Sequence, residues 1–355
     1  MDLTVTSGNE GPVQSPLSVI TFVAPELVEL VERRYAVLRA VAAGEPVGRR
    51  TLSDRLSWSE RITRSEVELL RGIGLVELGN SGVSLSATGR QILTQVGQIV
   101  SELQGLHDLQ DKMAAKFSLR RAFVVPGNCD TKRISRDALA RAAGEAILGV
   151  LGPSDVLAIS GGSTLANLSS HLPGHKDYPA VTVAPTGGGL GDALETEANT
   201  VVAQLAQALG AKYRLLHLPS DLGEQSVNIL LGAQPAIREI FDLIRSATVV
   251  VQGVGTLQSV ATRRGFTAAR IRGLERRGAV AESLGYFFDI TGKVVEAAGG
   301  VGLRLEDLGN AAHVIAVAGG ASKAAAIRSL LNTGLQHVLV TDEAAAHAIL
   351  SDSGA

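Results

Sequence analysis

Short glycine-rich segments recur directly after predicted strands in the C-terminal two-thirds of this 355-residue chain, and they constrain its fold more than any other feature. Each follows a run of apolar, often β-branched residues, which is typical of a strand buried in a parallel sheet. Helices are expected between most of these strands, so the pattern predicts a doubly wound α/β fold, in which ligands bind at the carboxyl ends of the strands. The four segments occupy residues 160–164, 185–191, 252–255 and 319–323.

Composition agrees with this fold, because the chain is 45% hydrophobic but only 3% aromatic, so that Ala, Val, Leu and Ile must build its core. Helices are expected at residues 134–151 and 165–172. Strands are expected at residues 122–126, 155–160, 180–184, 213–218, 248–252, 314–318 and 338–341.

The glycine segments share a chemistry suited to an anion. Gly161 and Gly162 precede the hydroxyls of Ser163 and Thr164 where a helix is expected to begin, and exposed amides at such points attract phosphate. Lys323 enters another expected helix directly after glycines. One such segment alone is a tight turn about as often as a ligand site, whereas four in one domain favour a phosphorylated small molecule. The remaining glycines of this candidate site are Gly187, Gly188, Gly189, Gly253 and Gly255.

The N-terminal quarter predicts a smaller domain of another kind. Apolar residues recur at helical spacing over residues 25–43, 50–56 and 60–71, and Ser59 suits the N-cap of the third helix. Two alternating runs around a Gly-Asn-Ser-Gly turn within residues 74–85 indicate a hairpin. This order of elements is that of a winged helix-turn-helix domain. Its third helix is expected to bury Ile62, Val67, Leu69 and Leu70.

In a winged helix-turn-helix domain the second helix of the pair lies in the major groove of DNA. The net charge of −2 does not itself indicate nucleic-acid binding, and Glu60, Glu66 and Glu68 dilute the local positive field. Modest affinity per monomer and dependence on dimerisation are therefore expected. The alternative is a protein-interaction module whose arginines are only solvated. The expected donors to phosphates and base edges are Arg49, Arg50, Thr51, Ser59, Arg61, Thr63 and Arg64.

A single long helix is expected to link the two domains. Its apolar positions, from Ile92 to Met113, recur at intervals of about 3.5 residues, which would suit a coiled-coil seam between two subunits. A helix packed on its own chain fits the same spacing. The expected organisation is a disordered Ser/Gly/Pro-rich tail at residues 1–20, the winged domain at 21–88, the linker helix at 89–117 and the ligand-binding domain at 118–355.

Other classes of protein are disfavoured by what the sequence lacks. Its single cysteine, Cys129, excludes a disulfide framework and favours a cytoplasmic location. The N-terminus has no charged segment followed by an apolar run, and no apolar stretch reaches the ~20 residues that span a bilayer. A GxGxxG fingerprint, a P-loop, a nucleophile elbow and a cluster of metal ligands are all missing. We therefore expect no catalytic residues, no metal and no cofactor.

The glycine segments, together with residues 197–200, 213–216 and 282–288, resemble the SorC family of sugar-binding transcriptional regulators from about residue 25 to the C-terminus. The resemblance implies a Rossmann-like domain related to ribose-5-phosphate isomerase and glucosamine-6-phosphate deaminase, without their activity. It also implies an oligomeric repressor of a glycolytic operon that releases operator DNA when fructose 1,6-bisphosphate binds. By position, it places Ser163, Thr164 and Lys323 on one phosphate, and Arg263 and Glu282 at the other end of the sugar.

Two positions depart from the family pattern: Gly187 stands where an arginine is expected, and Glu197 stands where a glutamine is expected. Losing a guanidinium removes a phosphate clamp, and gaining a carboxylate adds repulsion. A sugar monophosphate is therefore considered beside fructose 1,6-bisphosphate as the effector. The alternative function is a sugar-phosphate isomerase or deaminase with an N-terminal helical extension, which would need an acid/base pair in its pocket.

Overall fold

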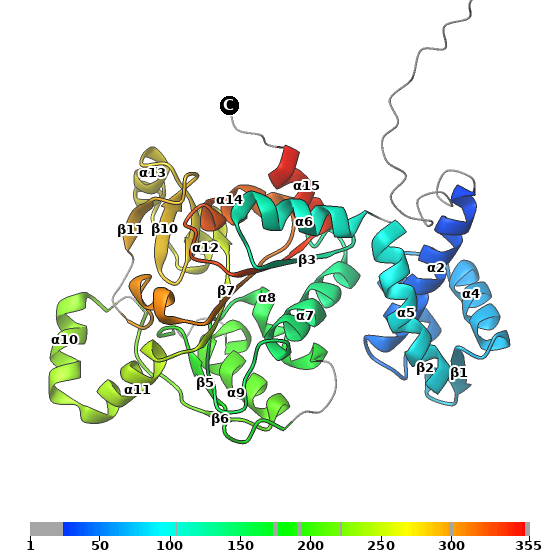
Figure 1. The fold of residues 1–355 in the computed structure, drawn as a ribbon, viewed down its shortest axis with the longest axis horizontal. Helices are drawn as coiled ribbons and strands as arrows, with labels where there is room; N and C mark the ends of the chain where they lie inside the picture. The colour runs from blue at the N-terminus through cyan, green and yellow to red at the C-terminus, as the bar shows by residue number, and fades with distance from the viewer. Residues whose placement is uncertain are drawn as a thin grey trace, which may run out of the picture. The chain divides into compact units, whose positions relative to one another are not determined.

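The computed structural model describes residues 24–103, 105–172, 177–189, 194–220, 222–297 and 301–351, drawn as the coloured ribbon in Figure 1. The tail expected at residues 1–20 lies outside the described residues. The chain divides into two units, Met1–His107 and Asp108–Ala355.

The N-terminal unit holds the expected elements of a winged helix-turn-helix domain in the expected order. Ser59 caps the third helix, because its Oγ accepts a hydrogen bond from the Ile62 backbone N–H at 3.4 Å. Two short strands then pair in antiparallel fashion around the expected turn. The elements are α2 (Pro25–Ala42), α3 (Arg49–Leu56), α4 (Glu60–Gly72), β1 (Val76–Gly79), β2 (Gly82–Leu85) and α5 (Ala87–Leu103).

The buried face of α4 differs from the expected one. Val67 and Leu70 are fully buried, as expected, but Ile62 and Leu69 are 43% and 39% exposed. Thr63, which was expected on the polar face, is 0% exposed and takes an inward position. Its hydroxyl donates to the backbone carbonyl four residues earlier at 3.2 Å, so burial leaves it with a hydrogen-bond partner.

The single linker helix expected over residues 89–117 is wrong, because α5 ends at Leu103 and a separate helix, α6 (Leu106–Phe117), follows it. Gly105 has a φ of +66°, a left-handed backbone conformation that ends a right-handed helix. On α6, Leu109 and Met113 are 6% and 0% exposed. These two side chains are packed within their own chain, so the proposed seam does not extend along α6.

Among the described residues, seven parallel strands form the main sheet of the C-terminal unit, in the order β3-β13-β12-β7-β4-β5-β6. Each lies at one of the strand positions expected from the sequence. Their bounds are β3 (Arg121–Val125), β4 (Val156–Ile159), β5 (Thr182–Pro185), β6 (Lys212–Tyr213), β7 (Val249–Gly253), β12 (His313–Val317) and β13 (Val338–Asp342).

Two expected elements of this unit are shorter than predicted. The strand expected at residues 213–218 stops at Tyr213, because the Leu216 backbone bonds with the side-chain amide of Asn199 instead of a neighbouring strand. The helix expected at residues 165–172 is only α8 (Ser163–Ala166), followed by a separate 3₁₀ turn. The polar Asn-Leu-Ser-Ser sequence after α8 explains this, since Asn and Ser side chains compete for backbone hydrogen bonds.

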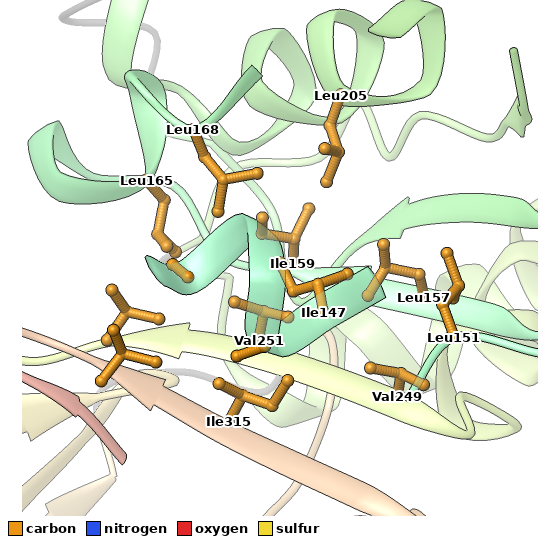
Figure 2. Close-up of a cluster of buried hydrophobic side chains, with 14 of the residues drawn as sticks. Ile147, Leu151, Leu157, Ile159, Leu165, Leu168, Leu205, Val249, Val251 and Ile315 are labelled. Atoms are coloured by element: carbon orange, nitrogen blue, oxygen red, sulfur yellow. The ribbon is translucent and has the colours of Figure 1, made fainter. Parts of the chain in front are cut away.

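Helices cover both faces of the main sheet (Figure 1). Val249 and Val251 of β7 point to one face, where they pack with Ile147 in the cluster shown in Figure 2. Val250, between them, points to the other face and packs in a second cluster with Phe241. The helices of this unit include α7 (Arg133–Leu148), α9 (Ala198–Leu209), α10 (Glu224–Ala233), α11 (Pro235–Arg245), α14 (Ala324–Leu331) and α15 (Glu343–Ser351).

A small antiparallel sheet, which we did not expect from the sequence, follows β7. Its strands lie in the order β11-β10-β9-β8, and the tight turn at Leu284 and Gly285 has φ values of +52° and +82°. Buried Leu257, Leu274 and Phe287 form its core. Its elements are β8 (Gly255–Thr256), α12 (Leu257–Arg263), α13 (Ala268–Arg276), β9 (Ala279–Ser283), β10 (Tyr286–Asp289) and β11 (Val294–Ala297).

Candidate functional site

The order of the main sheet places the four glycine segments side by side. β12, β7, β4 and β5 are consecutive neighbours, and each neighbouring pair is parallel. Because carboxyl ends of neighbouring parallel strands lie at the same edge of a sheet, the segments that follow these four strands meet at that edge. This edge, with the segments 160–164, 185–189, 253–255 and 319–323, is called the strand-end site below.

The segments after β4 and β7 are bonded to each other. The Gly253 backbone N–H donates to Ser160 Oγ at 3.0 Å. Gly161 also has backbone on its other side, since an added Cβ would lie 2.6 Å from the Thr196 carbonyl oxygen and 2.8 Å from the Ala198 nitrogen. Only glycine fits at this position, so its role in shaping the segment is steric.

Ser163 and Thr164 follow this packed turn. Gly162 has a φ of +117°, which lets the chain reverse so that the exposed Ser163 begins α8. α8 has only four residues, so its aligned peptide dipoles contribute less than the expected longer helix would have done. An anion here would depend on individual N–H groups and on the two hydroxyls.

The segment after β5 is the one that carries the two departures from the family pattern. A Cβ at Gly187 would lie 2.9 Å from the Val301 carbonyl oxygen, and one at Gly188 would lie 3.0 Å from the Val301 side chain. A Cβ at Gly189 would collide with the carboxylate of Glu197. This part of the strand-end site therefore presents glycine backbone and a carboxylate. The remainder of the expected segment, residues 190–191, lies outside the described residues.

Lys323 supplies a cation at the β12 end of the site. Burial lowers the pKa of the Lys323 ammonium, because the charged form loses hydration, while the carboxylate of Asp130 opposes this shift. The positive charge of Arg263 also lowers the Lys323 pKa. Binding of an anion would stabilise the charged form of this partly desolvated ammonium.

Arg263, the last residue of α12, and Glu282, on β9, lie close to each other. Glu282 is 6% exposed and pairs with Arg263 at 3.9 Å and with Arg264 at 3.4 Å. Its Oε1 also accepts the Gly285 backbone N–H at 2.9 Å, which fixes the carboxylate. Gly255, at the start of this sheet, has no room for a side chain, because a Cβ would lie 2.6 Å from Val260 Cγ2.

Asp342 and Asp130 support the Lys323 segment and were missed in the sequence. Asp342, 0% exposed at the end of β13, accepts the backbone N–H groups of Cys129 at 2.5 Å and Gly320 at 2.9 Å. Asp130 accepts the Ser322 N–H at 2.9 Å and its hydroxyl at 2.7 Å. A signal existed: an aspartate directly ends one apolar strand, and Asn-Cys-Asp follows shortly after another.

The two ends of the strand-end site differ in charge. Lys323, Arg263 and Arg264 gather at the β12 and β8 end, whereas hydroxyls, glycine backbone and Glu197 gather at the β4 and β5 end. Cations and hydrogen-bonding groups in one site suit a ligand that carries both a phosphate and hydroxyl groups. Within the described ranges, no three His, Cys, Asp or Glu side chains converge as a metal site would require.

The N-terminal unit presents a second set of candidate residues. Arg50 and Thr51 are exposed at the start of α3, and Ser59, Arg61 and Arg64 are exposed on the outer side of α4 or at its cap. Arg49 is also exposed but pairs with Glu68 at 3.2 Å. The prediction that Thr63 contacts DNA is wrong, because a fully buried hydroxyl cannot reach a base edge or a phosphate. Trp58, between α3 and α4, is half-buried.

Comparison with known protein families agrees with this division. The CggR N-terminal DNA binding domain family matches residues 30–100, and the Sugar-bind family, a sugar-binding domain, matches residues 101–351. Curated relatives include the central glycolytic genes regulator of Priestia megaterium, 34% identical over 96% of this chain and 99% of that protein. The protein of the same name from Bacillus subtilis is 31% identical over 92% of this chain and 96% of its own length.

Solved structures show the same fold. A SorC family transcriptional regulator from Enterococcus faecalis is 34% identical with a TM-score of 0.62, over 69% of this chain and all of that one. The full-length sorbitol operon regulator SorC from Klebsiella pneumoniae is 18% identical with a TM-score of 0.63, over 91% of this chain and 98% of that one. In the part of the chain that is described, no helix is long and apolar enough to cross a membrane.

The fold and its two sites define a transcriptional regulator with an N-terminal DNA-binding domain and a C-terminal sugar-binding domain. The chain belongs to the SorC family of sugar-binding transcriptional regulators. The relatives named above are themselves regulators of transcription, and none of the matched families is catalytic.

Proposed function

We propose that this chain represses a glycolytic or other carbohydrate operon in the cytoplasm, and that a phosphorylated sugar controls its grip on operator DNA. The name shared by two relatives, central glycolytic genes regulator, supports the choice of genes. A homo-oligomer, dimer or tetramer, follows from the geometry of winged domains, because paired recognition helices read paired half-sites. The residues proposed to contact DNA are Arg49, Arg50, Thr51, Ser59, Arg61 and Arg64.

One observation carries the sensor half of this proposal: four glycine segments meet at neighbouring strand ends, with Lys323 and Arg263 at one side. Phosphate is the group that accepts hydrogen bonds from both backbone amides and cationic side chains. We propose that Lys323, after β12, and Ser163 and Thr164, after β4, bind the same phosphate from the two sides of β7. We propose that Arg263 and Glu282 bind the rest of the ligand.

The β5 end of the strand-end site favours a sugar with one phosphate over one with two. Gly187 provides no cationic side chain where the family pattern has an arginine. A Cβ at this position would also lie 2.9 Å from the Val301 carbonyl oxygen, which leaves little room for a larger residue. Glu197 adds a carboxylate beside Gly189, and a carboxylate repels phosphate but accepts hydrogen bonds from sugar hydroxyls. A hexose or triose monophosphate is therefore the preferred effector class, with fructose 1,6-bisphosphate as the competing choice.

A thermal-shift series with the full chain tests this assignment. Fructose 6-phosphate is expected to raise the melting temperature more than fructose 1,6-bisphosphate at equal concentration, and unphosphorylated fructose is expected to have little effect. Lys323→Ala and Arg263→Ala should each reduce the shift. Equal shifts in both variants and in the parent chain would place the phosphate elsewhere.

DNA binding by the same protein tests the other half. Affinity for an operator-containing duplex should fall steeply with salt concentration and should change when the stabilising sugar phosphate is added. If sugar phosphates alter neither the DNA complex nor the oligomeric state, the proposed sensor function is wrong. Turnover of ribose 5-phosphate or glucosamine 6-phosphate by the purified chain would instead establish the isomerase or deaminase alternative.

A further inference from the structure

The small antiparallel sheet and its helices carry a positive charge that the winged domain does not. Residues 255–297 contain six arginines and one lysine against four carboxylates, a net charge of +3 in a chain of net charge −2. Residues 24–103 contain ten arginines against ten carboxylates, a net charge of zero. The part of the chain that is expected to grip DNA is therefore electrically neutral.

Many arginines of the winged domain are also engaged within that domain. Arg33 and Arg34 lie near Glu66 at 3.9 and 3.7 Å, and Arg71 pairs with Glu68 at 3.4 Å. Arg49 and Arg90 are paired as well. DNA affinity depends mainly on the number of phosphates that free cations neutralise. Few such cations remain on this domain, so further contacts elsewhere on the protein would strengthen binding.

α13 offers such cations on one exposed surface. Arg272 and Arg276 lie four residues apart, which places them on the same side of the helix, and both are exposed. Within the described residues, neither has an ion-pair partner. Arg270 and Arg277 lie toward the other side of the helix, where both pair with the carboxylate of Glu296. Figure 1 shows α13 beside the strands of the small sheet.

We propose that the exposed face of α13 that carries Arg272 and Arg276 binds the phosphate backbone of DNA. The inference rests on the proposed function, in which the winged domain reads the operator, and adds a contact from the ligand-binding domain. Guanidinium groups along one helix face match the repeated phosphates of a duplex without reading its bases. The contact is therefore independent of sequence and adds to the number of phosphates that the protein neutralises.

Fluorescence anisotropy with the full chain and a long mixed-sequence duplex tests this contact over a range of KCl concentrations. Arg272→Gln/Arg276→Gln should reduce the slope of log affinity against log salt by about 1.8 for each bound subunit, since each phosphate contact contributes about 0.9. Affinity at low salt should fall about tenfold. Arg272→Lys/Arg276→Lys keeps both charges and should keep the slope.

Lys212→Gln/Arg214→Gln is the matched control, because it removes two exposed positive charges from the β6 edge of the same domain. It should leave the slope unchanged. An unchanged slope in the α13 variant would overturn the inference and leave the proposed function intact. This result is expected if the surface binds an acidic protein instead of DNA. An equal loss in the control also overturns it, by showing a general effect of charge. If the unmodified chain does not bind the duplex at any salt concentration, the proposed function itself fails.

Discussion

The two candidate sites of this protein are built in opposite ways. On α4, Arg61 and Arg64 project from an exposed helix surface, and the residues that hold the helix in place, Val67 and Leu70, lie on its other side. At the strand-end site, the binding groups are largely backbone atoms of tightly packed glycine segments, supported by buried side chains. We therefore expect that substitutions on α4 can abolish DNA binding without loss of stability, whereas substitutions in the glycine segments should reduce sugar binding and stability together.

Asp342→Ala should produce the largest effect on stability. The carboxylate is 0% exposed and accepts backbone N–H groups from Cys129, Gly320 and Ala345, so its removal leaves three buried donors without a partner. We expect a loss of about 3–5 kcal/mol in the free energy of unfolding. Chemical denaturation measures it. Asp342→Asn, which keeps one carbonyl oxygen, should lose less, and a loss below about 1 kcal/mol in the alanine variant would refute this role.

Arg61→Ala/Arg64→Ala should have the next largest effect, and only on DNA binding. If both guanidinium groups contact base edges or phosphates, operator affinity should fall about 100-fold. The melting temperature should stay close to that of the parent chain, because both side chains are exposed. Glu60→Ala, on the same exposed helix turn, is the control and should not weaken binding. A large drop in melting temperature in the double variant would break the contrast between the two sites.

Gly161→Ala should destabilise the protein and weaken its sugar response together. The new Cβ would lie 2.6 Å from the Thr196 carbonyl oxygen, and backbone cannot yield as a flexible side chain does. We expect about 1–3 kcal/mol of destabilisation, measured by denaturant titration. Gly232→Ala is the matched control, because nothing lies within 4 Å of a Cβ there and its helical position favours alanine. Equal effects of the two substitutions would contradict the packing argument.

His337 should give the smallest effect, confined to acidic conditions. Burial and the charge of Arg120 lower the pKa of His337, and its Nδ1 accepts the Val314 backbone N–H at 3.0 Å, which requires the neutral ring. The unfolded chain therefore binds the proton more readily, and stability should decrease as pH falls below the ordinary histidine pKa of about 6.5. His337→Gln, compared by melting temperature between neutral and mildly acidic pH, should show a weaker dependence. An identical dependence in both proteins would exclude this histidine.

Much of the fold was predictable because its signals are local. Strands such as residues 249–253 are apolar on both faces and end in glycine, and this pattern needs no knowledge of distant contacts. The order of strands in the sheet, which brings the four segments together, is set by long-range packing. The expectation that they meet depended on the general rule for doubly wound sheets, and the structure agrees with it.

The errors arose where tertiary contacts override local pattern. Thr63 was expected on the surface of α4 because it is polar, but its hydroxyl bonds within the helix and allows burial. Gly105 lies in a run of apolar residues at helical spacing, which predicts a continuous helix, but its positive φ ends the helix. The roles of Asp342 and Asp130 depend on bonds between segments about 200 residues apart, which no local pattern reports.

A crystal structure of the full chain grown with fructose 6-phosphate would test the central claim most directly. The account predicts a phosphate bonded to Lys323 Nζ at the carboxyl ends of β12, β7 and β4, with the sugar extending toward Arg263 and Glu282. A sugar phosphate bound at any other part of the molecule, with this strand edge unoccupied, would contradict it.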